Sequence, residues 1–210
     1  MLNVIIADDH PIVRAGLRQI IAEDAGLKVA AEAGDGHGLL SMMRSHVYDV
    51  VLLDITMPGM DGLDVLKQLK LEFPKVPVII LTVHPESQYA LRVLRAGASG
   101  YLTKESAPDE LIAAIRKVHR GGKYISPALA EKIAFVLDRD TDKLPHETLS
   151  DREYQVLCML ASGKTVSEVA DELALSVKTV STYRSRILEK MQMKTNAELI
   201  HYALQNGLVS

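Results

Sequence analysis

The stretch VVLLDITMPGMDG, residues 50–62, decides the fold of this 210-residue chain. Four apolar residues in succession predict a strand that is buried on both faces, as in a parallel sheet covered by helices. The strand runs directly into a carboxylate, Asp54, and then into a Pro-Gly loop. A charge at the end of a buried strand raises the question of what it binds.

Short apolar runs alternate with amphipathic stretches along the first 120 residues. The apolar runs cover residues 3–7, 28–33, 50–54, 76–82 and 99–103, and the helical patterns cover 11–24, 37–46, 63–71, 86–96 and 107–120. Five βα units predict an α/β fold, a doubly wound five-stranded parallel sheet of the flavodoxin-like kind. Ligands of such sheets bind beyond the carboxyl ends of the strands.

The remainder of the chain is different in character. A Gly pair, a predicted helix from about Pro127 and a polar, proline-containing stretch together indicate a linker. Everything after it is helical in pattern, and four helices with a joint of a few residues near 175–177 predict an all-α helix-turn-helix domain. The predicted domains are therefore 1–122, a linker with a helix over 123–146, and 147–210.

Capping residues mark the ends of the predicted C-terminal helices. Ser150 with Glu153, and Thr195 with Glu198, have the spacing of reciprocal capping boxes. Gly163 and Gly207 stand where two of these helices should stop.

Polar side chains follow three of the predicted strands where each strand ends, and a lysine follows another. Asp8 and Asp9 follow the first strand, Asp54 the third and Thr82 the fourth, and Lys104 follows the fifth. Parallel strands bring all of these groups to one edge of the sheet, where the carboxylates would repel one another unless a cation joined them. Oxygen ligands of this density suit Mg²⁺, and a carboxylate beside Mg²⁺ and an ammonium can accept a phosphoryl group. Each aspartate alone is as readily a turn former or helix cap.

Residues 1 to about 122 resemble a bacterial response-regulator receiver domain in the motifs ADDHP, LLDITMPGMDG, ILT and GYLTK. The resemblance implies that Asp54 is the phosphoacceptor, assisted by Lys104 and Thr82. It also implies that Thr82 and Tyr101 form a switch pair. The implied Mg²⁺ ligands are Asp9, Asp54 and the backbone carbonyl of Thr56, supported by Asp8.

A haloacid-dehalogenase-like phosphatase is the alternative for this pocket, since its nucleophile is also a strand-terminal aspartate. Such an enzyme needs a second aspartate two residues later as the general acid, and Thr56 stands there. The sequence therefore favours a protein that is no enzyme beyond accepting, and at most releasing, its own phosphoryl group.

Residues 178–194 hold five basic side chains and one acid, although residues 148–210 are neutral overall. On a helical wheel Val180, Ile187 and Met191 form a buried stripe. Small hydroxyls and cations occupy the opposite side, as insertion into the major groove of DNA requires. A solvated amphipathic helix is the alternative. The predicted base-facing residues are Lys178, Ser181, Thr182 and Ser185, and the predicted phosphate-facing residues are Thr179, Arg184, Arg186 and Lys190.

Residues 149–191 resemble the LuxR-type DNA-binding domain, and the whole chain resembles a NarL/FixJ family response regulator. The resemblance implies a sensor histidine kinase and double-stranded DNA with promoter half-sites as partners, and a homodimer paired through the helix at 195–206. RNA polymerase is a further candidate partner. A receiver that only docks a protein partner is the remaining alternative.

Composition is consistent with these expectations. The chain has one cysteine, Cys158, so it has no internal disulfide framework. The N-terminus lacks a signal-peptide pattern, and no stretch approaches the roughly 18 apolar residues of a membrane span. We therefore expect a cytoplasmic protein without membrane contact.

Overall fold

The computed structural model describes residues 1–57, 59–83, 86–105, 108–127, 129–131 and 144–209. The chain forms two compact units, residues 1–131 and 132–210. Much of the predicted linker lies outside the described residues, and so does most of its predicted helix, of which Pro127 and residues 129–131 are helical.

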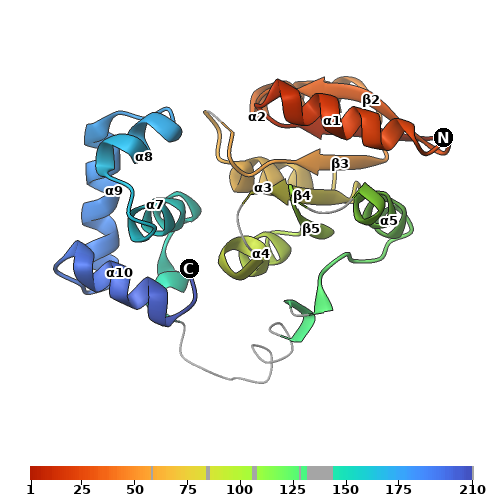
Figure 1. Ribbon diagram of the computed structural model, residues 1–210. Helices are drawn as coiled ribbons and strands as arrows, with labels where there is room; N and C mark the ends of the chain where they lie inside the picture. Colours follow the sequence, from red (N-terminus) through yellow and green to blue (C-terminus); the bar gives the residue numbers. More distant parts are fainter. Residues whose placement is uncertain (58, 84–85, 106–107, 128, 132–143, 210) are drawn as a thin grey trace. The chain divides into compact units, whose positions relative to one another are not determined.

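The first unit is built on five parallel strands in the order β2-β1-β3-β4-β5 (Figure 1). The strands are β1 (Leu2–Ala7), β2 (Leu27–Ala33), β3 (Val50–Leu53), β4 (Val78–Thr82) and β5 (Gly100–Thr103). Every strand end lies within two residues of its prediction, and every residue of β3 and β4 is buried. The strand order reverses between β1 and β3, which is where such sheets open a crevice beyond the strand ends.

Five helices flank this sheet (Figure 1). They are α1 (Pro11–Ala22), α2 (Gly36–Ser45), α3 (Gly62–Glu72), α4 (Glu86–Arg95) and α5 (Pro108–His119). Leu17 and Ile21 of α1 share one hydrophobic core with Ile115 of α5 and with alternate strand residues such as Val4 and Leu52. Helices α1 and α5 therefore cover the same face of the sheet, because alternate residues of a strand point to the same side.

The first unit continues beyond residue 122. Tyr124 forms a parallel bridge with Gly100, its N–H donates to the Ser99 carbonyl at 2.9 Å, and its own carbonyl accepts from Tyr101 at 3.1 Å. A residue that the sequence analysis placed in the linker thus lies along β5.

The second unit is helical, as predicted. It contains the short 3₁₀ helix η1 (Pro145–Thr148), then α7 (Asp151–Ala161), α8 (Val166–Glu172), α9 (Val177–Lys190) and α10 (Asn196–Gln205). Helix α7 packs against α9 and α10, and α8 packs against α9. Only four residues separate α8 from α9, and Ala174 among them has φ +52°, which turns the chain sharply into α9.

One of the two predicted capping boxes is confirmed and the other is half wrong. Ser150 and Glu153 cap each other reciprocally at the start of α7. Thr195 accepts from the Glu198 N–H, but the Glu198 carboxylate accepts from the N–H of Lys194 at 2.7 Å and not from that of Thr195. Thr195 is more extended than Ser150, with φ −131° against −61°, and this difference accompanies the shift of donor by one residue. Gly163 and Gly207 follow their helices with φ +91° and +61°, as expected of terminators.

Candidate functional site

Two buried carboxylates lie side by side at the carboxyl edge of the sheet. Ala7 and Leu53 are paired in register at the ends of β1 and β3, so that Asp8 and Asp54 follow at the same level. The Asp54 N–H donates to the Ala7 carbonyl at 2.9 Å, which extends the ladder by one residue. Asp8 is 1% exposed and Asp54 is 2% exposed. The predicted convergence of strand ends therefore occurs, inside the protein and not on its surface.

Lys104 joins these two carboxylates. It follows β5, where its N–H donates to the Thr82 carbonyl at 2.8 Å. Its Nζ donates a hydrogen bond to Asp54 Oδ2 at 2.7 Å and lies in an ion pair 2.7 Å from Asp8 Oδ2. From the sequence, a metal ion was expected to relieve the repulsion between the carboxylates. The structure shows that a lysine ammonium already relieves part of it.

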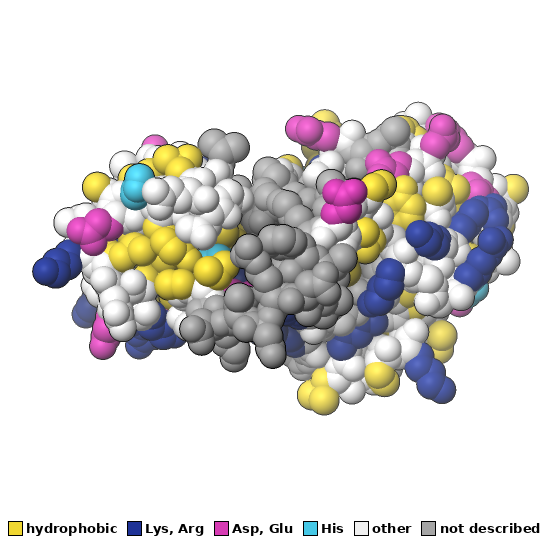
Figure 2. All heavy atoms as spheres, turned by 90° about the horizontal axis from the view of Figure 1, so that it is seen from below, with side chains coloured by type: hydrophobic (Ala, Val, Ile, Leu, Met, Phe, Trp, Pro, Cys, Tyr) yellow, Lys and Arg dark blue, Asp and Glu magenta, His cyan; other side chains and the backbone are white. Residues whose placement is uncertain are grey.

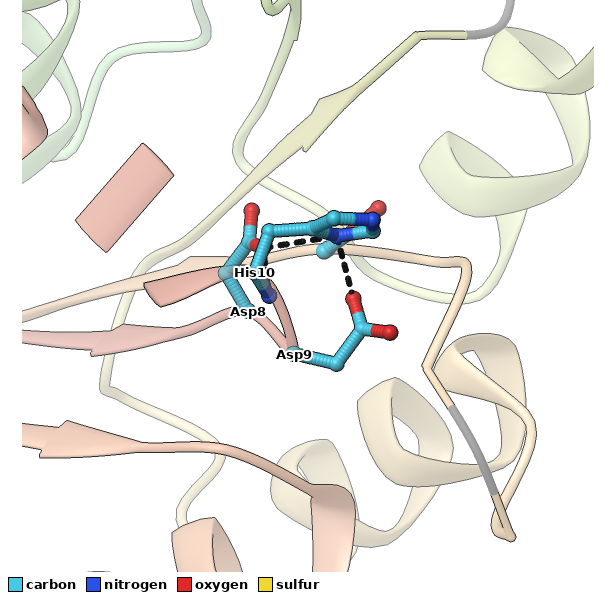
Figure 3. Close-up of side chains that lie close together, drawn as sticks. Asp8, Asp9 and His10 are labelled. Atoms are coloured by element: carbon cyan, nitrogen blue, oxygen red, sulfur yellow. Dashed lines mark hydrogen bonds and ion pairs between the residues drawn. The ribbon is translucent and has the colours of Figure 1, made fainter. Parts of the chain in front are cut away.

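Asp9 and His10 complete the cluster (Figure 3). His10 Nδ1 lies 2.7 Å from Asp9 Oδ1 and 3.4 Å from Asp8 Oδ1, and the His10 N–H donates to Asp8 Oδ1 at 2.8 Å. Asp8, Asp9, His10 and Asp54 each offer a ligand atom within 4.8 Å of all the others. Asp9 and His10 are the more exposed members, so the cluster is open toward solvent on their side.

Two buried oxygens of this cluster accept no hydrogen bond from the part of the chain that the structure describes. They are Asp8 Oδ2 and Asp9 Oδ1, each 2.7 Å from a nitrogen but without hydrogen-bond geometry. Buried carboxylate oxygens normally have partners, since an unsatisfied one costs free energy. Hard oxygen ligands at this spacing fit a divalent cation such as Mg²⁺.

The backbone after Asp54 also faces the carboxylates. The Thr56 N–H donates to Asp54 Oδ1 at 3.0 Å, which places the Thr56 peptide beside the acids. Both oxygens of Asp54 therefore accept a hydrogen bond, one from Thr56 and one from Lys104.

Burial and charge act in opposite directions on this site. Burial raises the pKa of Asp54, and the nearby Asp8 charge adds to that effect, while the bonds from Lys104 and Thr56 only partly offset it. Burial lowers the pKa of Lys104, but its hydrogen bond to Asp54 and its close contact with the Asp8 carboxylate outweigh burial, so that the pKa of Lys104 is raised. The lysine therefore stays charged beside the carboxylates.

The two residues of the predicted switch pair are both inside the fold. Thr82 is 0% exposed at the end of β4, and Tyr101 is 1% exposed on β5. Tyr101 is paired with Ile80, two residues before Thr82, so the two lie on neighbouring strands. The Tyr101 ring points inward in this structure.

Arg14 is a residue of the site that the sequence analysis missed. Its Nη1 donates to the backbone carbonyl of Asp8 at 2.6 Å, and its Nε donates to Glu32 on β2 at 3.3 Å. The guanidinium therefore holds the main chain of the acidic loop against β2. An arginine on an amphipathic helix carries no sequence signal for this role.

The second site is the exposed side of α9. Val180, Ile187 and Met191 are buried, as the wheel predicted, and Lys178, Ser181, Thr182, Ser185 and Arg186 are exposed. The Thr182 and Ser185 hydroxyls donate to backbone carbonyls one turn earlier, at 2.9 and 3.1 Å, so these side chains lie close to the helix. The exposed side of α9 therefore carries short side chains that project little from the helix, with the cations Lys178 and Arg186 beside them.

Three of the four predicted phosphate-facing residues have side-chain partners within the unit. Arg184 Nε donates to Asn196 Oδ1 at 2.6 Å, and Lys190 Nζ donates to Glu153 Oε2 at 2.6 Å. Thr179 Oγ1 lies 2.7 Å from the hydroxyl of Ser176, which caps α9. Arg186 has no ion pair with any residue in the described ranges.

Two family profiles together match most of the chain. Residues 4–116 match the response regulator receiver domain, and residues 147–203 match the bacterial regulatory proteins of the luxR family. Among the described residues, no helix is both long and apolar enough to cross a bilayer.

Known proteins are similar along the full length. Response regulator UvrY of Escherichia coli (strain K12) is 39% identical over 209 residues, covering 99% of this chain and 96% of that protein. Response regulator GacA of Pseudomonas aeruginosa is 38% identical over 210 residues, covering 100% and 98%. The Salmonella enterica serovar Typhimurium RcsB structure bound to promoter rprA with the phosphomimetic BeF3- has a TM-score of 0.67 and 29% identity, covering 96% and 97%.

Proposed function

Because the chain belongs to the NarL/FixJ family of two-component response regulators, with a receiver domain and a LuxR-type DNA-binding domain, we propose that Asp54 accepts a phosphoryl group and thereby controls DNA binding by α9. One observation carries the proposal more than any other. A single ammonium, that of Lys104, lies 2.7 Å from both buried carboxylates, next to oxygens that accept no hydrogen bond within the described residues.

The proposed donor is the phosphohistidine of a sensor histidine kinase. A carboxylate oxygen of Asp54 attacks phosphorus, a P–O bond forms, and the P–N bond to the donor imidazole breaks as that ring takes up a proton. Lys104 pairs with an oxygen of the transferred group, and the Thr82 hydroxyl moves to another. Phosphoryl transfer depends mainly on positioning and charge stabilisation, and these residues supply both.

Mg²⁺ is the proposed cofactor. The proposed ligands are Asp9, Asp54 and the Thr56 carbonyl, with Asp8 in support. The buried oxygens of Asp8 and Asp9 that accept no hydrogen bond from the described residues favour this assignment. Mg²⁺, when bound, neutralises negative charge on the phosphoryl oxygens.

A phosphatase reaction on external substrates is less well supported. Thr56 occupies the position of the required second acid, and its N–H is already bonded to Asp54. Without a general acid the leaving group has no proton donor. We propose that the protein turns over no external phosphate ester and at most hydrolyses its own acyl phosphate.

The proposed DNA-binding surface is the exposed side of α9. Lys178, Ser181, Thr182 and Ser185 face the bases in this proposal, and Arg186 faces a phosphate. Short side chains let a helix approach base edges, and cations at its edges reach the backbone. The RcsB structure in complex with promoter rprA supports this assignment by analogy. DNA binding would also place the protein in the cytoplasm, and RNA polymerase stays a predicted partner.

Pairing of two chains through α10 is the proposed active assembly. Leu204 on α10 is 53% exposed, and hydrophobic side chains gather over this helix in the view from below (Figure 2). A dimer reads two half-sites about one helical turn of DNA apart.

Phosphoryl labelling tests the proposed acceptor. Wild type incubated with a radiolabelled acyl phosphate and Mg²⁺ should acquire an acid-labile, hydroxylamine-sensitive label, and Asp54→Asn should acquire none because it lacks the nucleophile. Asp64→Asn, at an exposed carboxylate of α3, is the matched control and should label normally. Undiminished labelling of Asp54→Asn would move the acceptor elsewhere.

A further inference from the structure

Glu153 is the buried carboxylate of the helical unit, at 3% exposure, within the described part of the chain. Its Oε2 accepts from the Ser150 N–H at 2.8 Å, in the capping box of α7, and from Lys190 Nζ at 2.6 Å. One oxygen atom thus accepts hydrogen bonds from the N-cap of α7 and from a side chain of α9.

Lys190 is the last residue of α9, the helix that carries the proposed base-reading side chains. Its side chain is 42% exposed, yet its ammonium points back to Glu153. A cation in the last turn also interacts favourably with the carbonyl end of the helix. The ion pair therefore joins the N-terminus of α7 to the C-terminus of α9.

The other contacts of α9 with its unit include the hydrogen bond from Arg184 to Asn196 of α10 at 2.6 Å and an apolar stripe. Val180, Ile187 and Met191 form an apolar stripe, and hydrophobic burial is non-directional, so the stripe tolerates small rotations and shifts of the helix. A charge-assisted hydrogen bond to a buried carboxylate has a fixed length and direction. The Glu153 carboxylate is itself held by the Ser150 N–H, so it fixes the position of the C-terminal end of α9 through Lys190.

The protonation state of Glu153 is consistent with this role. Burial alone would raise the pKa of Glu153, but the bonds from Lys190 and from the Ser150 backbone and hydroxyl outweigh burial and leave the pKa below its usual value. The carboxylate is therefore charged at neutral pH.

We propose that Glu153 and Lys190 are positioning residues for DNA reading, which set the axial and rotational placement of α9, and that Lys190 is not a phosphate contact. This inference rests on the proposed DNA-binding function of α9. The sequence predicted Lys190 as a phosphate-facing residue from its charge, and the present proposal replaces that role.

Arg186 provides the matched comparison. It stands four residues before Lys190 on the same helix, is exposed, and forms no ion pair within the described residues.

A phosphate contact and a positioning residue differ in two measurable ways. Loss of a phosphate contact weakens binding about equally on all sequences and lowers the slope of log K against log salt by about 0.9. Loss of placement weakens binding to the preferred sequence while the slope is unchanged, because base contacts carry the specificity.

The experiment uses the full chain and two duplexes of equal length. One is selected from a random DNA pool by the wild-type protein, and the other has an unrelated sequence. Lys190→Met should bind the selected duplex roughly tenfold more weakly, the size of one lost base contact, with an unchanged salt slope and a nearly unchanged affinity for the unrelated duplex. Arg186→Gln should lower both affinities together and reduce the slope. Lys190→Arg, which keeps the charge and can pair with Glu153, should restore most of the selectivity.

Folding is controlled by melting each variant and measuring binding well below its transition. Glu153→Gln is the second variant and gives the same test if Lys190→Met does not fold, because it keeps the shape of the side chain and removes its charge. We expect reduced selectivity at an unchanged slope.

The inference is overturned if Lys190→Met behaves like Arg186→Gln, with equal losses on both duplexes and a slope reduced by about one. It is also overturned if Glu153→Gln leaves selectivity intact. Failure of the wild-type protein to select any duplex would instead contradict the proposed DNA-binding function, and the two failures are thereby distinguished.

Discussion

Lys104 is the residue that compensates the charges of the acidic site. Its ammonium offsets the charges of Asp8 and Asp54, which are both buried and would otherwise repel each other. A buried carboxylate without a partner costs several kcal/mol, so the pair is needed for the fold as well as for the proposed chemistry.

Replacing Lys104 should therefore affect the stability of the fold and the proposed phosphoryl transfer. Lys104→Met should slow labelling of Asp54 by an acyl phosphate about 10²-fold, since a positioned cation that stabilises developing charge contributes about that much. The measurement is a labelling time course in saturating Mg²⁺. Lys67→Met removes an exposed ammonium on α3 and should label at the wild-type rate. Equal rates for both variants would show that Lys104 has no part in the transfer.

Glu153 makes the stability of the helical unit depend on pH. Its pKa lies below the usual value of 4.5, so it contributes stability that is fully present above about pH 4.5 and is lost as pH falls through the lower pKa of the folded state.

The expected result is increasing hydrogen exchange in α7 and α9 as pH falls below 4.5, after correction for the intrinsic exchange rate. Glu153→Gln should show a weaker dependence because it has no charge to lose. A dependence in Glu153→Gln as steep as in wild type would assign the acid lability to another group.

At the scale of an element, the loop from β3 to α3 is shaped by Gly62. A Cβ atom at this position would lie 2.5 Å from the Ile55 Cα and 2.8 Å from the Asp54 carbonyl oxygen. Both are backbone atoms of the loop that carries the proposed phosphoacceptor, so they cannot move without displacing it. The N-terminus of α3 therefore packs directly on the site, and only glycine permits that approach.

Alanine substitutions at two glycines test this packing. Gly62→Ala should destabilise the first unit by about 3 kcal/mol, the upper part of the range for overpacking, and should impair labelling of Asp54. Gly16→Ala, on the exposed side of α1 with no atom within 4 Å of the new Cβ, should be neutral or stabilise by about 0.5 to 1 kcal/mol. Urea unfolding measures both. A mild effect of Gly62→Ala would mean that the loop adjusts without moving Asp54.

At the scale of the whole molecule, the chain joins a receiver unit to a helical unit through residues that lie mainly between 122 and 146. The two units have separate cores, so the proposed control of one by the other requires a coupling free energy. Values of about 1 to 3 kcal/mol are usual for such coupling.

A phosphomimetic measures this coupling directly. Full-length protein with Mg²⁺ and beryllofluoride should change its affinity for a selected duplex by about 5- to 150-fold relative to Mg²⁺ alone. Asp54→Asn should show no change with beryllofluoride, since the acceptor oxygen is missing. An identical response of both proteins would remove Asp54 from the control of DNA binding.

Sequence alone was sufficient for the architecture. Buried strands such as β3, the alternation with amphipathic helices, and glycine stops such as Gly163 are local signals, since propensity and periodicity act within a few residues. The convergence of Asp8, Asp54 and Lys104 could also be predicted, because parallel strands place their ends at one edge.

Only the tertiary structure decided which partner each charge takes. Arg14 bonds to the Asp8 carbonyl, Lys190 bonds to Glu153, and the Glu198 carboxylate caps Lys194, and none of these pairings follows from residue type. A long side chain reaches several partners, and the choice depends on distances between elements far apart in sequence. The sequence by itself thus determined the elements and the chemistry at their ends. Packing decided which cations are free to meet a ligand and which hold the fold.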